Sequence, residues 1–203
     1  MSRKQRFHKR ESNVVTFNNY VEKTRDIIIK PRNRNQEKYL DLLENSKNYI
    51  VMALGPAGTG KTYLAMLAAV KAFREGEVDR IVLTRPAVGV EDEKHGFLPG
   101  DLNQKMDPWV RPLTDILREY YRQADIAAMI ADQVIEIAPL AFMRGRTFKK
   151  CFILADEMQN SSPNQMLMLT TRIGKGSKMV VTGDLNQSDR LVENGLKDFI
   201  EKY

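Results

Sequence analysis

Apolar and polar positions follow two alternating periods along most of the chain. Short apolar runs bounded by Gly, Pro or charged residues predict buried strands, and stretches with helical spacing predict helices between them. The predicted strands cover residues 48–55, 80–85, 133–139, 150–156 and 178–184. The predicted helices cover residues 61–74, 109–131 (one or two helices), about 163–172 and 191–202. Strands separated by helices predict right-handed crossovers and a mainly parallel sheet covered on both faces, an α/β fold.

Length and composition limit the class of protein. A chain of 203 residues suffices for one α/β domain, and 42% hydrophobic with 29% charged residues is typical of a soluble globular protein. No stretch approaches the roughly 20 apolar residues of a membrane span, and the basic N-terminus lacks the apolar segment of a secretory signal. Cys151 is the single cysteine, which excludes an intramolecular disulfide and favours a cytoplasmic protein.

The positive charge belongs mainly to the N-terminal part of the chain. Residues 1–34 contain ten Lys or Arg and three Asp or Glu, a net +7, which leaves −1 for residues 35–203 out of the total of +6. We therefore expect a basic N-terminal arm over residues 1–34 and a single nearly neutral domain over residues 35–203. Such an arm commonly contacts nucleic-acid phosphates, although a solvated leader has the same composition.

A phosphate-binding loop joins the first predicted strand to the first predicted helix. Its motif, G-x-x-x-x-G-K-[ST], is formed by Gly55, Pro56, Ala57, Gly58, Thr59, Gly60, Lys61 and Thr62. Glycines let several backbone N–H groups point at one anion, and the helix N-terminus adds partial positive charge. We expect Lys61 to contact the β- and γ-phosphates of ATP and the Thr62 hydroxyl to ligate Mg²⁺.

Two acidic residues end the predicted strand 150–156. Asp156 is expected to hold Mg²⁺ from the carboxyl end of this strand, and Glu157 to polarise the water that attacks the γ-phosphate. A pair of solvated acids at a strand end is the alternative interpretation.

The last predicted strand leads into the sequence T-G-D-L-N-Q (182–187), which is similar to the γ-phosphate-sensing motif of superfamily-1 helicases. Gln187 is the expected sensor. An N-K-x-D guanine motif is absent, so a GTPase is not expected. Gln36, ahead of the first strand, is a candidate for the adenine edge because its amide offers a donor and an acceptor.

These motifs together resemble the PhoH family, and the similarity extends from about Ile28 to the C-terminus. Besides the phosphate loop, the matching stretches are L-T-R-P-A-V (83–88), G-F-L-P-G-D-L (96–102), D-P-W-V-R-P-L (107–113), P-L-A-F-M-R-G-R-T-F (139–148) and D-E-M-Q-N (156–160). The resemblance implies a RecA-like P-loop NTPase fold, ATP hydrolysis with Mg²⁺, RNA-linked activity and phosphate-starvation responses. Phage-encoded members are common, which would make the host cytoplasm the location.

Two departures limit what the resemblance implies. Longer relatives carry a nuclease-like PIN domain or RNA-binding extensions, and we expect no room for either in 203 residues, so intrinsic nuclease activity is not implied. Arg190 also stands where the family usually has Leu.

Superfamily-1 motors place ATP between two RecA-like domains, the second of which supplies arginines, whereas one such domain is expected here. A neighbouring copy is the simplest source, since an arginine finger is often worth about 10³–10⁵ in rate. We therefore expect a homo-oligomer, and resemblance to hexameric members favours a ring of six. Arg144 and Arg146 are the first candidates for the finger, ahead of Arg172 and Arg190.

The path of a nucleic-acid strand is predicted from the resemblance to helicases. Thr84, Arg85 and Pro86 follow the second strand, where helicases contact single strands, and Phe97 and Trp109 are candidates for base stacking. Both aromatic residues belong to or border the long connection 86–108, and packing beneath it is the alternative for each.

The sequence is compatible with three functions. The leading one is an ATPase acting on or with RNA or another single-stranded nucleic acid, in the manner of a helicase. The second is a nucleotide-gated nucleic-acid-binding adaptor without translocation, and the third is a small-molecule kinase, which would need an acceptor pocket and an Arg-rich lid.

Overall fold

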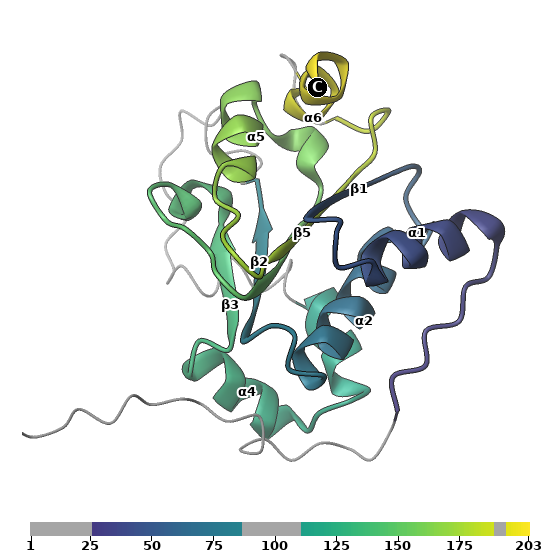
Figure 1. Cartoon of the computed structure of the whole chain (residues 1–203), viewed down its shortest axis with the longest axis vertical. Helices are drawn as coiled ribbons and strands as arrows, with labels where there is room; N and C mark the ends of the chain where they lie inside the picture. Colours follow the sequence, from purple (N-terminus) through teal and green to yellow (C-terminus); the bar gives the residue numbers. More distant parts are fainter. Residues whose placement is uncertain (1–25, 87–110, 189–193) are drawn as a thin grey trace, which may run out of the picture.

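A parallel sheet forms the centre of the fold (Figure 1). The computed structural model describes residues 26–86, 111–188 and 194–203. Within these ranges the strands are β1 (Ile50–Leu54), β2 (Arg80–Arg85), β3 (Ile135–Pro139), β4 (Cys151–Ala155) and β5 (Lys178–Gly183). They lie in the order β1-β5-β4-β2-β3, and each neighbouring pair is parallel. The predicted α/β class is confirmed, and the strands match the predicted ranges to within two residues.

Helices connect the strands. The described helices are α1 (Arg34–Glu44), α2 (Lys61–Arg74), a helix over residues 111–118, α4 (Gln123–Ala131), α5 (Pro163–Thr170) and α6 (Gly195–Lys202), with short 3₁₀ helices η2 (Leu140–Met143) and η3 (Met158–Asn160). Helix α1 was not predicted. Asn33 caps its N-terminus by accepting a hydrogen bond from Gln36 N at 3.0 Å, and the helix buries Leu40 and Leu43.

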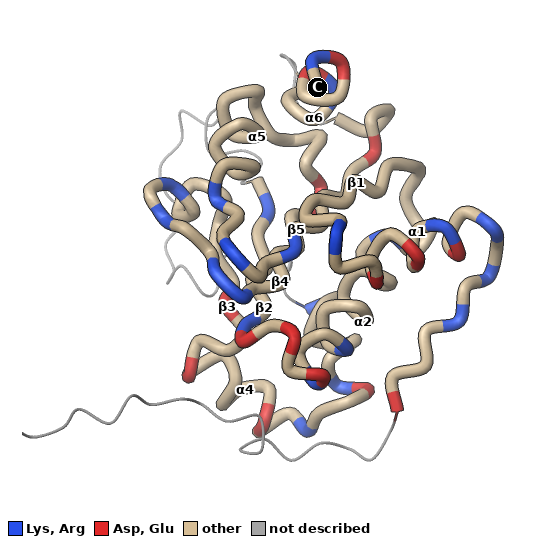
Figure 2. Tube along the Cα trace, viewed as in Figure 1, with Lys and Arg blue, Asp and Glu red and all other residues tan. Residues whose placement is uncertain are grey.

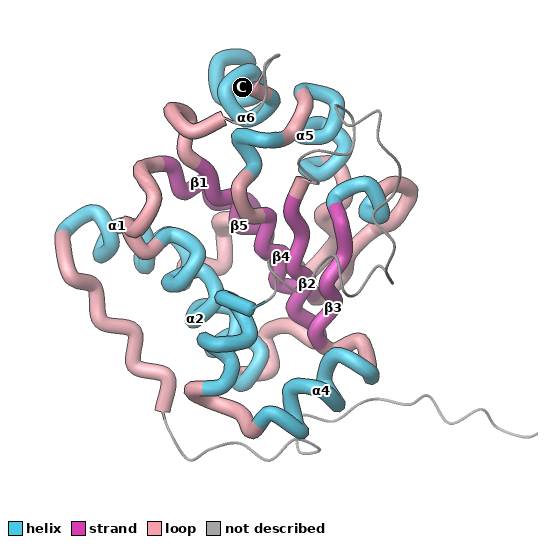
Figure 3. Tube along the Cα trace, turned by 180° about the vertical axis from the view of Figure 1, so that it is seen from behind, coloured by secondary structure: helices cyan, strands magenta, loops and turns pink. Residues whose placement is uncertain are grey.

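The sheet separates two apolar clusters. Helices α1, α2, α4 and the helix 111–118 contribute to the cluster on one face, while η2, η3, α5 and α6 contribute to the cluster on the other. Figure 3 shows α2 and α4 on one side of the sheet and α5 and α6 on the other. Every residue of β4 is buried, as expected for a central strand of a sheet covered on both sides. Ile27 and Ile29, which fall within the range predicted to form an N-terminal arm, pack against the first cluster.

Backbone hydrogen bonds continue past the carboxyl ends of the strands. Gly55 N donates to Gly183 O at 3.1 Å, and Asp156 N donates to Thr84 O at 2.9 Å. Because parallel strands end at the same edge, these bonds hold the segments after β1, β5, β4 and β2 beside one another.

Helix α6 docks closely on the segment that joins η3 to α5. Gly195 N donates to Ser161 O at 2.8 Å, and Asn194 caps the helix by accepting from Lys197 N at 3.1 Å. A Cβ atom at Gly195 would lie 2.3 Å from the carbonyl carbon and oxygen of Ser162. Only a glycine therefore allows the helix to approach this closely.

Cys151 lies at the start of β4 and is completely buried. Its thiol donates to Lys149 O at 3.0 Å, and burial raises the pKa of the thiol above its usual range. None of the described helices is both long and apolar enough to cross a membrane.

We predict that Gly195→Ala lowers the free energy of unfolding by about 1–3 kcal/mol, because the added methyl group meets rigid backbone. Urea unfolding of the variant and the parent measures this difference. Lys197→Ala on the same helix is the control and is expected to be near neutral, since its contact with Glu201 is exposed. Equal stability of Gly195→Ala and the parent would contradict the close docking.

Candidate active site

The phosphate-binding loop lies between β1 and α2, as the sequence predicts. Gly58 and Gly60 have φ values of +76° and +86°, a region that other residues adopt only with strain. Lys61 Nζ donates to the carbonyl oxygens of Gly55 and Pro56 at 2.7 and 2.8 Å, so its ammonium group lies against the loop. Helix α2 has no side-chain cap at its N-terminus, which leaves its first N–H groups available to an anion.

Helix α1 supports this loop from outside. Gln36 Nε2 donates to Thr59 O at 3.0 Å, while Gln36 Oε1 accepts from Arg32 N at 2.7 Å. The Tyr39 hydroxyl donates to Lys61 O at 3.3 Å. Burial, with a smaller contribution from Asp156, raises the pKa of Tyr39 well above its usual range, so the phenol remains a neutral donor.

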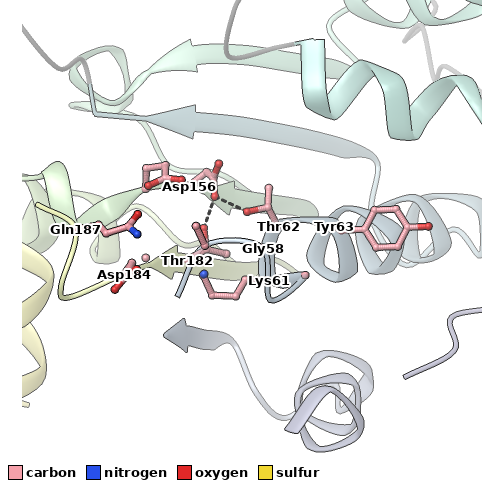
Figure 4. Close-up of a pocket in the computed structure, with 12 residues that line it drawn as sticks. Gly58, Lys61, Thr62, Tyr63, Asp156, Thr182, Asp184 and Gln187 are labelled. Carbon is pink, nitrogen blue, oxygen red and sulfur yellow. Dashed lines mark hydrogen bonds between the residues drawn. The ribbon is translucent and has the colours of Figure 1, made fainter. Parts of the chain in front are cut away.

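Asp156 joins the loop to the strands (Figure 4). Its Oδ1 accepts a hydrogen bond from Thr62 Oγ1 at 2.7 Å and a second from the Thr182 hydroxyl on β5. A hydroxyl and a carboxylate in contact beside a phosphate loop are oxygen donors of the kind that Mg²⁺ prefers. The described residues contain no group of three or more His, Cys, Asp or Glu side chains placed to hold a metal ion together. Mg²⁺ does not require such a group, because it retains several of its waters.

Glu157 directly follows Asp156 and has a left-handed backbone conformation, with φ 55° and ψ 40°. A non-glycine residue in this region costs on the order of 1–3 kcal/mol and is held there by its surroundings. Its Oε2 accepts a hydrogen bond from Gln159 Nε2. Strain of this kind often occurs at functional sites, where it directs a side chain.

One open pocket brings these groups together (Figure 4). Besides the loop residues Ala57, Gly58 and Gly60, its lining includes Lys61, Thr62, Asp156, Glu157, Asp184 and Gln187. The main residues predicted for phosphate, metal, water and sensing therefore converge at the carboxyl edge of the sheet. Gln187 belongs to a turn in which its N–H donates to Asp184 O at 3.1 Å.

The two leading arginine candidates do not line this pocket. Arg146 makes a bidentate ion pair with Glu136 on β3, and its guanidinium lies 4.5 Å from the centre of the Phe148 ring. The hydrogen bond to Glu136 is the main cause of a raised Arg146 pKa. Arg144 is exposed.

The other candidate arginines differ in what the structure describes of them. Arg172 donates to the carbonyl oxygens of Met168 and Arg146 at 3.2 and 3.3 Å. Arg190 lies outside the described residues.

The candidates for nucleic-acid contact are less accessible than the sequence suggests. Thr84 and Pro86 are buried at the end of β2, and Arg85 is half-buried. Among the described residues, the Thr84 hydroxyl has no hydrogen-bond partner. Phe97 and Trp109 lie outside the described residues.

Sequence reasoning assigned no role to several residues of the site. Thr182 and Gln159 contact the two acids, Tyr39 contacts the loop, and Tyr63 lines the pocket. Thr182 and Gln159 belong to the motifs T-G-D-L-N-Q (182–187) and D-E-M-Q-N (156–160), so the sequence could have indicated that both residues lie in the site. Their hydrogen-bond partners depend on the fold.

Comparison with known proteins identifies relatives over most of the chain. The family model described as PhoH-like protein matches residues 28–203. A PhoH-like protein of Mycobacterium tuberculosis is 52% identical over 161 residues, 79% of this chain and 45% of that protein. A Bacillus subtilis PhoH-like protein is 46% identical over 170 residues (83% and 52%), and Escherichia coli Protein PhoH is 39% identical over 176 residues (85% and 49%). The chain spans about half the length of these curated relatives.

A solved structure is also similar. The SWI2/SNF2 ATPase core of Sulfolobus solfataricus, in complex with double-stranded DNA, superposes with a TM-score of 0.45 at 12% identity, over 72% of this chain and 30% of that chain. A TM-score of this size is too low to carry an argument about function.

We predict that Thr84→Val raises the free energy of unfolding by about 1 kcal/mol, because the hydroxyl is buried with no partner in the described part of the chain and has lost its hydration. Chemical denaturation measures the change. Thr182→Val is the matched control and is expected to destabilise, since its hydroxyl donates to Asp156. A loss of stability in Thr84→Val would mean that the hydroxyl does have a partner.

Proposed function

The chain belongs to the family of PhoH-like proteins, and from this membership and the geometry of the pocket we propose that it binds ATP with Mg²⁺ and hydrolyses it. We further propose that it acts in the cytoplasm on or with single-stranded nucleic acid, for which RNA is the favoured candidate. The observation that carries the proposal is the convergence of Lys61, Thr62, Asp156, Glu157 and Gln187 on one pocket at the carboxyl edge of the sheet.

Each group has a role that its position supports. Lys61 and the N–H groups at the start of α2 bind the phosphates, and the oxygens of Thr62 and Asp156 would hold the metal. The bound metal would neutralise charge that develops on the γ-phosphoryl oxygens. Glu157 orients the attacking water and accepts its proton while the bond to the ADP leaving group breaks.

Gln36 is proposed to contact the adenine from beside the loop. Its amide already touches the loop through Thr59 O, and a Cβ at Gly60 would lie 3.1 Å from its Nε2. A purine edge would replace the bonds that the amide makes to the backbone.

Support for a polyanionic partner comes from two adjacent loops before β4 and β5, where Lys and Arg positions gather (Figure 2). Phe148 and Ile173 pair as an isolated bridge that holds the loops together. Their basic residues are Arg144, Arg146, Lys149, Lys150, Arg172 and Lys175. Such a surface suits a phosphate backbone better than the buried side chains of Thr84 and Pro86.

An arginine finger would have to come from a second copy of the chain. The phosphate loop follows edge strand β1, whereas Arg144 and Arg146 follow β3 at the opposite edge. In a homo-oligomer, the β3 edge of one subunit would lie beside the β1 edge of the next. Resemblance to hexameric family members favours a ring of six subunits. Arg144 is the better candidate, because Arg146 is already paired with Glu136.

We predict that single-stranded RNA stimulates steady-state ATP hydrolysis and that Glu157→Gln reduces the rate by about 10²–10⁴-fold, because a positioned base is lost. Binding of a fluorescent ATP analogue is expected to be unchanged in Glu157→Gln and lost in Lys61→Ala. Binding of both ATP and RNA without any stimulation would instead support the nucleotide-gated adaptor.

For the finger, we predict that Arg144→Ala lowers kcat by at least about 10³-fold with stability unchanged, because the guanidinium acts on a neighbouring γ-phosphate. Arg146→Ala is the comparison, and it is expected to lower the unfolding temperature, since Glu136 loses its bidentate partner and keeps only the longer contact with Arg80 at 3.9 Å. Mixing Arg144→Ala with Lys61→Ala subunits should restore part of the activity. A parental rate in Arg144→Ala would rule out this residue as the finger, and parental rates in both single variants would rule out both candidates.

A further inference from the structure

Gln159 is a buried polar residue close to both functional halves of the pocket. It belongs to η3, directly after the two acids, and its exposed fraction is 1%. A buried amide must form hydrogen bonds to avoid a large loss of hydration energy. Both ends of this amide are used, and each contacts a different segment of the site.

The nitrogen end of the amide holds Glu157. Gln159 Nε2 donates to Glu157 Oε2, so the carboxylate cannot turn without breaking this bond. The left-handed backbone at Glu157 limits where the side chain can go, and the bond from Gln159 selects its orientation.

The oxygen end holds the turn after β5. Gln159 Oε1 accepts from Asp184 N at 3.1 Å, and Asp184 O in turn accepts from Gln187 N at 3.1 Å. A second contact is made by Ser188 Oγ, which donates to Gln159 O at 3.2 Å. The residue before the turn is Gly183, where a Cβ would lie 2.4 Å from Leu196 Cδ2 and 3.0 Å from Gln159 Oε1, so the glycine makes room for both side chains.

We propose that Gln159 is a positioning residue, which orients the Glu157 carboxylate and connects it to the turn that carries Gln187. One amide group then links the residue that orients water to the residue that contacts the γ-phosphate. A shift of the turn on nucleotide binding or phosphate release is transmitted to Glu157 through this side chain. The inference rests on the proposed role of Glu157 in ATP hydrolysis.

The test compares Gln159→Met with the parent protein. Methionine has a similar length and fits a buried site, but it neither donates to Glu157 nor accepts well from Asp184 N. We expect kcat to fall about 10–100-fold, while the KM for ATP and the affinity for a non-hydrolysable ATP analogue change less than about threefold. Hydrogen exchange of the Asp184 amide should become at least about tenfold faster.

Gln165→Met is the matched control. Gln165 is also a glutamine whose amide oxygen accepts a backbone hydrogen bond, from Ser162 N at 2.8 Å, but it completes the capping box of α5 and does not line the pocket. This control should lower the unfolding temperature and leave kcat and Asp184 exchange at parental values.

A second variant keeps the test decisive if Gln159→Met does not fold. Gln159→Glu retains an acceptor for Asp184 N but loses the donor to Glu157, so kcat should fall with KM unchanged. Parental kcat in the folded variant, or an equal fall in Gln165→Met, would overturn the inference. If the parent does not hydrolyse ATP, or if Glu157→Gln does not slow it, the proposed function itself fails and the inference with it.

Discussion

One oxygen of the Asp156 carboxylate accepts hydrogen bonds from Thr62 at the start of α2 and from Thr182 at the end of β5. These bonds cross between three segments that are far apart in the sequence. The carboxylate is partly withdrawn from water, which is unfavourable without hydrogen-bond donors, and the two hydroxyls supply donors to Oδ1. The relative positions of the phosphate loop, the acid-bearing strand and the last strand all depend on this contact.

The order of the strands makes the contact possible. Strand β5 lies between β1 and β4, so Thr182 stands beside both the loop strand and the strand that ends in the two acids. All strands end at the same edge, and α2 directs its N-terminus to that edge. The chain turns sharply after β4, and this turn places Glu157 in the left-handed conformation, which is energetically unfavourable for a non-glycine residue. The hydrogen bond from Gln159 helps to hold Glu157 in this conformation.

Much of this arrangement follows from local sequence. The apolar runs located each strand, and the spacing of Gly55, Gly60 and Lys61 located the loop. Helix α1 was not predicted because its apolar side is narrow and buries only Leu40 and Leu43. Asn33 is a residue type that often caps helices and could have indicated where this helix starts. The hydrogen-bond partners of the polar side chains, by contrast, depend on contacts between segments that are distant in the sequence.

Three cases illustrate that limit. Arg146 reaches Glu136 on another element, and Gln159 reaches Asp184 across the sheet edge. Thr84 is buried although its residue type and position suggested a contact surface. The pattern of residue types in the sequence predicts where a helix or strand lies and where it ends. The direction in which a side chain points depends on the packing of segments that are distant in the sequence.

The burial of Cys151 has a practical consequence for studying motion in this protein. The thiol lies at the start of the central strand, away from solvent, and its raised pKa keeps it in the unreactive protonated form. Maleimide dyes and spin labels should therefore leave the parent chain unmodified. A single cysteine introduced on an exposed turn would then carry the label alone, so that the chain can be followed by fluorescence or electron paramagnetic resonance without removing its native cysteine.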